Sequence, residues 1–302
     1  MTRAGVARLA AAFAAGIAVL GAGGCAYLDV KQREWIFRPQ RDLHAAPDSY
    51  GLKYEEVWLT VAGQTDDTHE RVHGWWIPGP DAAGPTLLYL HGARWSLSNN
   101  LFRIQRLHRM GFSVLAIDYR GFGCSDGELP SEEQAYADAQ AAWEHVRLLE
   151  PDPRRRFAYG HSLGSAVAID LATRNGDVAG LIVESSFTSI RDMAEAMGYG
   201  NYPIGLVLTQ HFDSLAKMNK VAAPVLFVHG ASDRYVPPAM SEQLFAAARE
   251  PKRLVLVKDA GHSNAMWVAF EQYQAAVRDF LVVVARSAAP VRPASAAAGQ
   301  GG

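Results

Sequence analysis

Gly160-His161-Ser162-Leu163-Gly164 is the most informative stretch of this 302-residue chain. It follows a short apolar run at residues 156–159 and opens a segment rich in small residues, which predicts a turn from a strand into a helix. Such a sharp turn exposes the serine hydroxyl and needs glycine on both sides, where side chains would clash. A serine hydroxyl attacks poorly unless it is aimed and given a base. The pattern therefore predicts Ser162 as a nucleophile, with an ordinary helix cap as the alternative.

Strands and helices alternate on both sides of this turn. We predict strands at residues 54–61, 70–77, 86–90, 112–118, 156–159, 180–184, 224–229 and 253–257. We predict helices at residues 97–110, 131–149, 162–175, 238–249 and 262–285. The first two strands form a hairpin, and uninterrupted apolar strands separated by helices are typical of a parallel sheet buried on both faces. The predicted fold class is therefore α/β: a doubly wound, mostly parallel sheet of about eight strands with helices on both faces.

A general base is expected near the end of a later strand. Ligands bind outside the carboxyl ends of the strands in doubly wound sheets, and serine hydrolases built on them supply their partners in the order Ser, acid, His. His262, in Gly261-His262-Ser263 after the last predicted strand, is the last histidine of the chain and is predicted to be the base. A capping or surface histidine is the alternative, and His91 and His161 fit the order less well.

The acid of this set should lie between the nucleophile and the base. Asp233 comes shortly after the strand predicted at residues 224–229, and it would hold one tautomer of His262 and stabilise the imidazolium. Asp259 is a weaker rival because it is too close in sequence to His262, and Asp213 is weaker still. The alternative role for Asp233 is that of a turn former.

Acyl transfer also needs donors for the developing oxyanion. The backbone N–H of Leu163, directly after the nucleophile, is one candidate, and that of Ala93, after His91-Gly92, is the other. Neither role requires a side chain. The sequence has no HExxH motif and no paired CxxC spacing, so we predict no metal site and expect no cofactor.

Composition describes a globular body with a large core. Apolar residues make up 49% of the chain and charged residues 20%, far from a disordered composition. A net charge of -2 and a single short basic run, Arg154-Arg155-Arg156, give no support to nucleic-acid binding. We expect one domain at residues 26–286 and a disordered tail at 287–302, which is rich in Ala, Pro and Gly. The oligomeric state does not follow from composition.

Residues 1–25 have the layout of a bacterial export signal. Arg3 and Arg8 supply positive charge, residues 9–20 are apolar, and small residues lead to Cys25. The apolar run is shorter than the roughly 20 residues of a membrane span. Cys25 resembles the acylated cysteine of bacterial lipoproteins. We therefore expect export to the cell envelope and a lipid anchor in a bacterial membrane, facing the periplasm, with ordinary cleavage or an uncleaved signal anchor as alternatives.

Together these residues make the chain resemble the α/β-hydrolase superfamily. Within it, the resemblance is to monoglyceride lipases, depalmitoylating thioesterases and serine-aminopeptidase-like hydrolases. The motifs that carry it lie at residues 91–93, 118–127, 160–164, 184–189, 229–233 and 261–262. It implies a serine hydrolase that cleaves ester or thioester bonds of a small-molecule or lipid substrate through an acyl-enzyme. A peptidase or amidase of the same fold, and a non-catalytic surface lipoprotein, are the alternatives.

The segment at residues 188–221 lies where this fold inserts a lid. It is short, and it contains apolar residues that include Met193, Met197, Tyr199 and Leu206. We expect a small cap and an open site, with binding energy from the first several methylenes at about 0.8 kcal/mol each. Short and medium acyl esters should then be preferred in solution. For a membrane lipid, the apolar residues would border the entrance.

Overall fold

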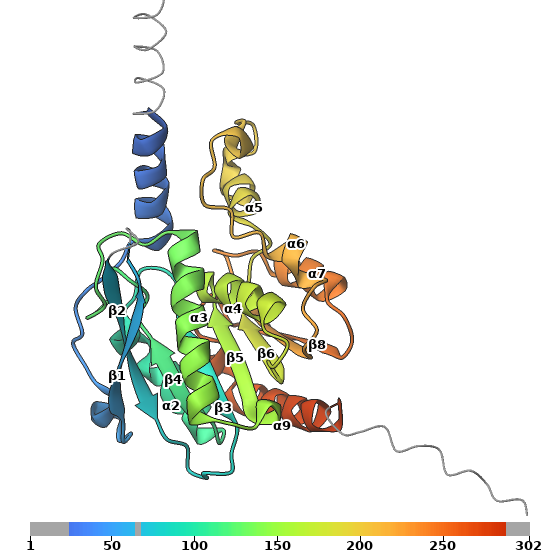
Figure 1. Cartoon of the computed structure of the whole chain (residues 1–302). Coiled ribbons are helices and arrows are strands. Elements are labelled where there is room, and N and C mark those ends of the chain that lie inside the picture. The colour runs from blue at the N-terminus through green and yellow to red at the C-terminus, as the bar shows by residue number, and fades with distance from the viewer. Residues whose placement is uncertain (1–23, 64–67, 288–302) are drawn as a thin grey trace, which may run out of the picture.

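Eight strands form one sheet in the computed structural model, which describes residues 24–63 and 68–287 (Figure 1). They are β1 Glu55–Ala62, β2 His69–Ile77, β3 Thr86–Leu90, β4 Ser113–Ile117, β5 Arg156–His161, β6 Gly180–Glu184, β7 Val225–Gly230 and β8 Lys252–Val257. Their spatial order is β1-β2-β4-β3-β5-β6-β7-β8. The β1–β2 and β2–β4 pairs are antiparallel and all others are parallel. The predicted mostly parallel sheet is confirmed.

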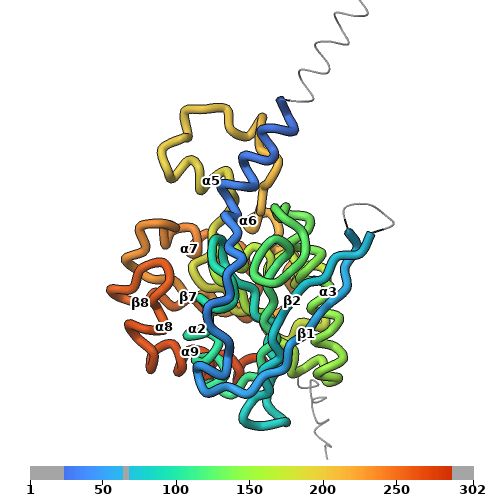
Figure 2. The backbone as a smooth tube through the Cα atoms, turned by 90° about the vertical axis from the view of Figure 1, so that its left-hand side faces the viewer, coloured from blue at the N-terminus to red at the C-terminus, as the bar shows by residue number. Residues whose placement is uncertain are grey.

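Helices cover both faces of this sheet. They are η1 Pro47–Tyr50, η2 Leu97–Asn100, α2 Leu101–Arg109, α3 Glu132–Leu149, η3 Pro153–Arg155, α4 Leu163–Arg174, α5 Ile190–Ala194, η4 Glu195–Tyr199, η5 Ile204–Leu206, α6 Ser214–Met218, α7 Pro238–Ala247, α8 Ala265–Val268 and α9 Phe270–Ser287. Figure 2 shows α3 on one side of the sheet and α2 and α9 on the other. The predicted double winding is therefore present.

The central strands are buried on both faces because helices pack on each. Successive strand residues point to opposite faces, so Leu87 packs in one cluster with Ile104 and Phe280, whereas Leu88 packs in the other with Trp143. Every residue of β3 to β7 is buried. This double burial explains why the strands are continuous apolar runs rather than alternating ones.

Helix α3 begins where its sequence predicts. The Ser131 side chain accepts a hydrogen bond from the backbone N–H of Gln134, and the Gln134 side chain accepts one from the Ser131 N–H. This reciprocal capping box satisfies two donors that the helix itself leaves unpaired. Glu132 and Glu133 in the first turn add favourable charge at the positive end of the helix dipole.

The last predicted helix differs from the structure at its start. Residues 261–264 form a loop, α8 is a single short turn, and α9 begins at Phe270. The Asn264 side chain accepts a hydrogen bond from the Gly261 N–H, and Ala269 has a non-helical backbone that separates α8 from α9. His262 therefore sits in a loop rather than at a helix start, and its backbone carbonyl is available to other donors.

Residues 24–37 form a helix that the sequence analysis left unassigned, named here helix 24–37. It rises from the sheet's C-terminal end beside the segment that carries α5 (Figures 1 and 2). Cys25 lies in its first turn and is exposed. Residues 1–23 and 288–302, which hold the rest of the expected export signal and of the expected tail, fall outside the described residues. In the part of the chain that is described, no helix has the length and apolar character of a membrane span.

Candidate active site

Ser162 occupies the tight turn between β5 and α4. Its backbone has φ of 54°, in the left-handed region that is unusual for residues other than glycine. A side chain on Gly160 would overlap the backbone of Gly164, and one on Gly164 would overlap the carbonyl of Leu90. The two glycines thus allow the elbow to pack against its neighbours. The Ser162 N–H donates to the carbonyl of Glu184 at 2.9 Å, which ties the turn to β6.

Ser162, His262 and Asp233 form one hydrogen-bonded chain. His262 Nε2 lies 2.9 Å from Ser162 Oγ, and His262 Nδ1 lies 2.8 Å from Asp233 Oδ2. The three residues follow β5, β8 and β7 respectively, and the carboxyl ends of these parallel strands lie along the same edge of the sheet. Residues 29 and 100 positions apart in sequence are thereby brought into contact. This is the geometry in which a carboxylate orients a base toward a hydroxyl nucleophile.

The Asp233 carboxylate is held ionised. It accepts hydrogen bonds from the backbone N–H groups of Tyr235 and Val236, and its other oxygen lies 3.2 Å from His229 Nε2. Burial opposes ionisation, but hydrogen bonds from His229 and His262 outweigh it and keep the pKa of the Asp233 carboxyl well below its usual range. A fixed negative charge of this kind stabilises an imidazolium at His262.

The two rival aspartates have other surroundings. Asp213 caps α6 by accepting from the Ala216 N–H at 3.0 Å. Asp259 is exposed in the turn after β8, where its backbone has φ of 60°. Asp233, not either rival, is the carboxylate hydrogen-bonded to His262.

Three side chains form hydrogen bonds with backbone carbonyl oxygens of the loop that carries His262. His161 Nε2 lies 3.1 Å from the carbonyl of His262, and Ser185 Oγ donates to the same oxygen at 2.8 Å. Arg103 Nη2 donates to the carbonyl of Ser263 at 3.0 Å. These three side chains come from different parts of the sequence. Arg103 and Ser185 were assigned no role from the sequence, whereas His161 was expected to shape the pocket or support the turn; both His161 and Ser185 lie in motifs of the family resemblance.

Arg103 is in turn held by a buried carboxylate. Glu184, at the end of β6 and fully buried, lies 3.1 Å from Arg103 Nη2. It also accepts hydrogen bonds from the hydroxyls of Tyr159 and Tyr273, at 2.5 and 2.8 Å. Burial favours the neutral acid, but the Arg103 charge prevails and lowers the pKa of Glu184 to about 2. A buried, charged network therefore supports the loop of the candidate base.

Comparison with known proteins places this chain in a family. The family described as Serine aminopeptidase, S33 matches residues 82–208. The α/β hydrolase domain-containing protein WAV2 of Arabidopsis thaliana is 30% identical, covering 82% of this chain and 85% of the relative. This chain belongs to the α/β-hydrolase superfamily. An uncharacterized Mycobacterium tuberculosis protein is 35% identical over 89% of this hydrolase and 94% of its own length. The esterase Pf2001 of Pyrococcus furiosus has the same fold, with a TM-score of 0.65, 22% identity and coverage of 81% and 98%.

The candidate oxyanion donors of this α/β hydrolase come from two segments that meet at Ser162. Leu163 is the first residue of α4, so its N–H has no acceptor within the helix. Gly92 packs against the elbow, since a Cβ there would lie 3.2 Å from Ser162 Cβ, and Ala93 follows it. Ala93 and Leu163 both line the cavity onto which Ser162 opens. The two predicted donors thus belong to segments that meet at Ser162 and line the same cavity.

A buried pair supports the loop that carries Ala93. His91 Nε2 lies 3.4 Å from Asp118 Oδ1, and that oxygen also accepts from the Leu97 N–H at 2.9 Å. Burial lowers the pKa of His91 to about 4 and raises the pKa of Asp118 to about 8, so neutral forms are favoured at both. The neutral His91–Asp118 pair therefore supports the loop without adding a negative charge near the proposed oxyanion site.

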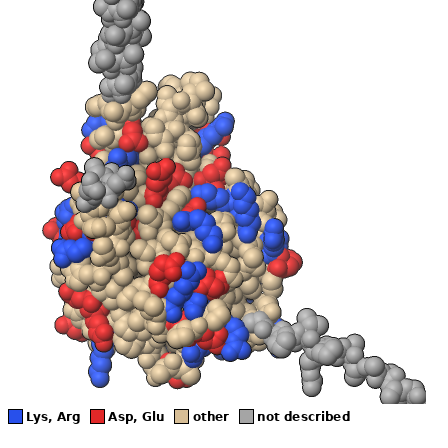
Figure 3. Space-filling model, viewed as in Figure 1, with Lys and Arg blue, Asp and Glu red and all other residues tan. Residues whose placement is uncertain are grey.

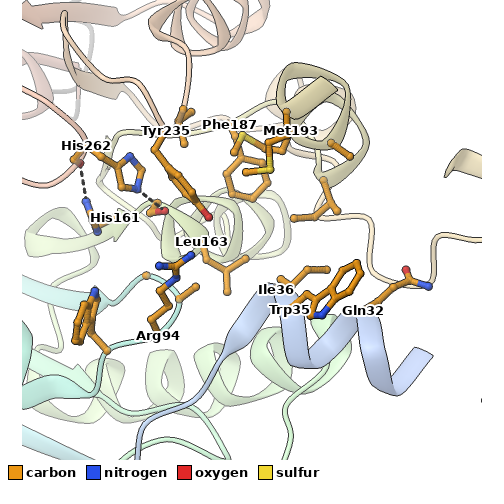
Figure 4. Close-up of a pocket in the computed structure, with 18 of the residues that line it drawn as sticks. Gln32, Trp35, Ile36, Arg94, His161, Leu163, Phe187, Met193, Tyr235 and His262 are labelled. Carbon is orange, nitrogen blue, oxygen red and sulfur yellow. Dashed lines mark hydrogen bonds between the residues drawn. The ribbon is translucent and has the colours of Figure 1, made fainter. Parts of the chain in front are cut away.

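Ser162 opens onto a cavity of about 990 Å³. One wall comes from the cap segment at residues 188–221 and includes Met193. The opposite wall comes from helix 24–37, and Figure 4 shows its Trp35 and Ile36 facing the elbow across the cavity. The expectation of a small, open cap did not include this second wall. The cavity is mainly apolar, and none of the described side chains that line it is a carboxylate. Its volume is at the upper end of ligand pockets.

Proposed function

We propose that this hydrolase cleaves carboxylic ester or thioester bonds through an acyl-enzyme intermediate. The observation that carries the proposal is the hydrogen-bonded chain from Asp233 through His262 to Ser162, opening on an apolar cavity. Ser162 Oγ attacks the acyl carbonyl carbon while His262 Nε2 takes its proton. The N–H groups of Leu163 and Ala93 donate to the oxyanion that forms. His262 then protonates the leaving oxygen or sulfur, and a water activated by His262 releases the carboxylic acid.

The acyl group, rather than the leaving group, is proposed to fill the cavity. Its walls are apolar on both the cap side and the helix 24–37 side, so a chain longer than the first several methylenes can be buried. An aminopeptidase needs an anionic group for the substrate's free amine. The lining within the described residues holds no carboxylate, and Arg94 at the cavity is a cation. These features favour an ester or thioester over a peptide with a free amino terminus.

A fluorophosphonate probe tests the reaction class. Wild-type protein should be labelled, and Ser162→Ala should fold normally but carry no label, because the hydroxyl is the bond-forming atom. Ser165→Ala is the matched control: Ser165 lies one turn away and donates to the Ser162 carbonyl, so its loss should leave labelling intact. Robust labelling of Ser162→Ala would contradict the proposal. Absence of labelling in the wild type would favour the non-catalytic lipoprotein.

Membrane attachment through Cys25 is proposed as part of this function. Cys25 ends the export-like segment and is exposed at the start of helix 24–37. Acylation of its sulfur would place the cavity close to a bilayer. Cys25→Ser should block acylation and retain the precursor, as judged by mass spectrometry and by partition into detergent. A mature amino terminus at another residue, without lipid, would rule out the anchor.

A further inference from the structure

We propose that an apolar collar around the cavity mouth docks on a lipid bilayer, so that the acyl substrate enters from the membrane. The collar consists of Tyr27, Val30 and Trp35 on helix 24–37 and Tyr199, Tyr202 and Leu206 in the cap segment. This inference rests on the proposed hydrolase function for the identity of the substrate. The docking itself rests on three separate observations. They are the exposure of the collar side chains, the hydrogen bonds that join helix 24–37 to the cap segment, and the polarity of helix 24–37.

The collar residues are unusually exposed for their chemistry. Leu206 is 87% exposed, Trp35 73% and Tyr202 66%. Tyr27, Val30 and Leu206 do not line the cavity, so a bound acyl chain would not cover them. Figure 3 shows the projecting tip of the cap segment as mainly uncharged. Neighbouring exposed apolar side chains of this size mark a surface that another apolar phase covers.

The two halves of the collar are tied into one unit. The Gln32 side chain donates to the carbonyl of Val207 at 2.8 Å and accepts from the Thr209 N–H at 2.9 Å. Gln210 Nε2 donates to Asp29 Oδ1 at 3.0 Å. Segments 175 to 181 residues apart in sequence therefore present their apolar side chains together, around the mouth of the cavity that lies between them.

Up to Arg33, helix 24–37 departs from the polarity of an ordinary surface helix, whereas its last residue, Phe37, is buried in the core. A surface helix normally turns its apolar stripe to the protein and its polar face to water. Here Asp29 and Gln32 bond to the cap segment and Arg33 bonds to the carbonyls at residues 129 and 130, while Tyr27 and Val30 are exposed and lie outside the cavity lining. The exposed charges Lys31 and Glu34 neutralise each other as an ion pair. This arrangement suits an apolar environment outside the helix.

A bilayer fits the collar better than a second protein does. Cys25 lies at the start of the helix, so the lipid proposed for it, or the apolar run at 9–20 if the segment is not cleaved, would hold this end of the molecule at a membrane. Tyrosine and tryptophan, four of the six collar residues, are the side chains enriched at membrane interfaces. With the mouth on the bilayer, an acyl chain can reach Ser162 without crossing water.

The test uses the full chain on phosphatidylcholine vesicles that contain a small fraction of p-nitrophenyl palmitate. Leu206→Asp should lower hydrolysis of this ester about tenfold, since burying a leucine is worth at least about 1.5 kcal/mol. Hydrolysis of soluble p-nitrophenyl butyrate should not change. The matched control is Leu148→Asp, because Leu148 is 78% exposed at the end of α3, away from the collar. Equal effects of the two variants on the vesicle-held ester would overturn the proposal.

A second measurement reports docking without activity. Brominated phosphatidylcholine should quench the part of the tryptophan fluorescence that Trp35→Phe removes. Quenching with no hydrolysis of either ester would support docking while contradicting the hydrolase proposal. Hydrolysis without quenching would contradict docking alone. A dimer that Leu206→Asp dissociates in sedimentation, with no quenching by vesicles, would mean that the collar binds a second copy of the chain.

Discussion

His161 and His262 are joined by a hydrogen bond from side chain to backbone: Nε2 of His161 lies 3.1 Å from the carbonyl oxygen of His262. Burial, reinforced by the Arg103 charge, keeps the pKa of His161 well below its usual range. His161 is therefore neutral near pH 7, and its Nε2 must carry the hydrogen to donate to the carbonyl. The residue before the proposed nucleophile thus positions the proposed base.

We expect His161→Ala to lower kcat by about tenfold while KM changes little, because a lost buried hydrogen bond costs about 1–3 kcal/mol and loosens His262. His161→Gln, whose amide can donate to the same carbonyl, should recover part of the rate. Steady-state kinetics with p-nitrophenyl butyrate measure both constants. A rise in KM alone, or no rescue by glutamine, would mean that His161 only shapes the pocket.

Asp233→Asn should reduce kcat on the order of 10⁴-fold by analogy with serine proteases, because the amide favours the wrong tautomer of His262. Asp259→Asn is the control, since Asp259 is the nearest rival in sequence and is exposed. Its activity should stay close to that of wild type. If Asp259→Asn is instead the damaging change, Asp233 has been given the wrong role.

Glu184→Gln should destabilise the fold by about 3–5 kcal/mol at pH 7, because it leaves the Arg103 charge buried without its partner. The folded-state pKa of about 2 lies below the ordinary value of 4.5. The Glu184 carboxylate therefore contributes stability above pH 4.5, and that contribution is lost as the pH falls toward 2. The variant should lack this component of acid sensitivity. Urea unfolding across this pH range measures it, with the exposed Glu242→Gln as a control that should change little.

Acyl-chain preference should depend on Trp35. The value of kcat/KM is expected to rise from p-nitrophenyl acetate through butyrate to octanoate, by up to about fourfold for each methylene buried. Trp35→Ala should reduce turnover of octanoate more than that of acetate, because Trp35 forms part of the wall opposite the elbow. Trp58→Ala, on β1, is the control. Equal losses for acetate and octanoate would contradict the role of helix 24–37 as an acyl wall.

Local pattern was sufficient to predict the sheet and to name the residues of the candidate site. Strand burial and helix capping depend on neighbours a few residues apart, so the runs that became β3 to β7 and the Ser131 cap are visible in the sequence. The order of Ser162, Asp233 and His262 follows from where strands end. Their mutual distances do not, because these depend on how the strands pair. The helix predicted at 262–285 was wrong at its start, since α9 begins at Phe270. Hydrogen bonding in the loop at residues 261–264 outweighs the local helix propensity there.

From the sequence alone came the α/β class, the elbow at Ser162 and its two partners, since these follow from apolar periodicity, glycine placement and chain order. Tertiary structure alone decided that Arg103 and Glu184 brace the loop of His262, and that helix 24–37 forms one wall of the cavity. These contacts join residues 81 to 181 positions apart. No local pattern encodes these contacts. They form only when the packed sheet fixes where each segment lies, and bringing such distant segments together costs chain entropy that depends on the whole fold.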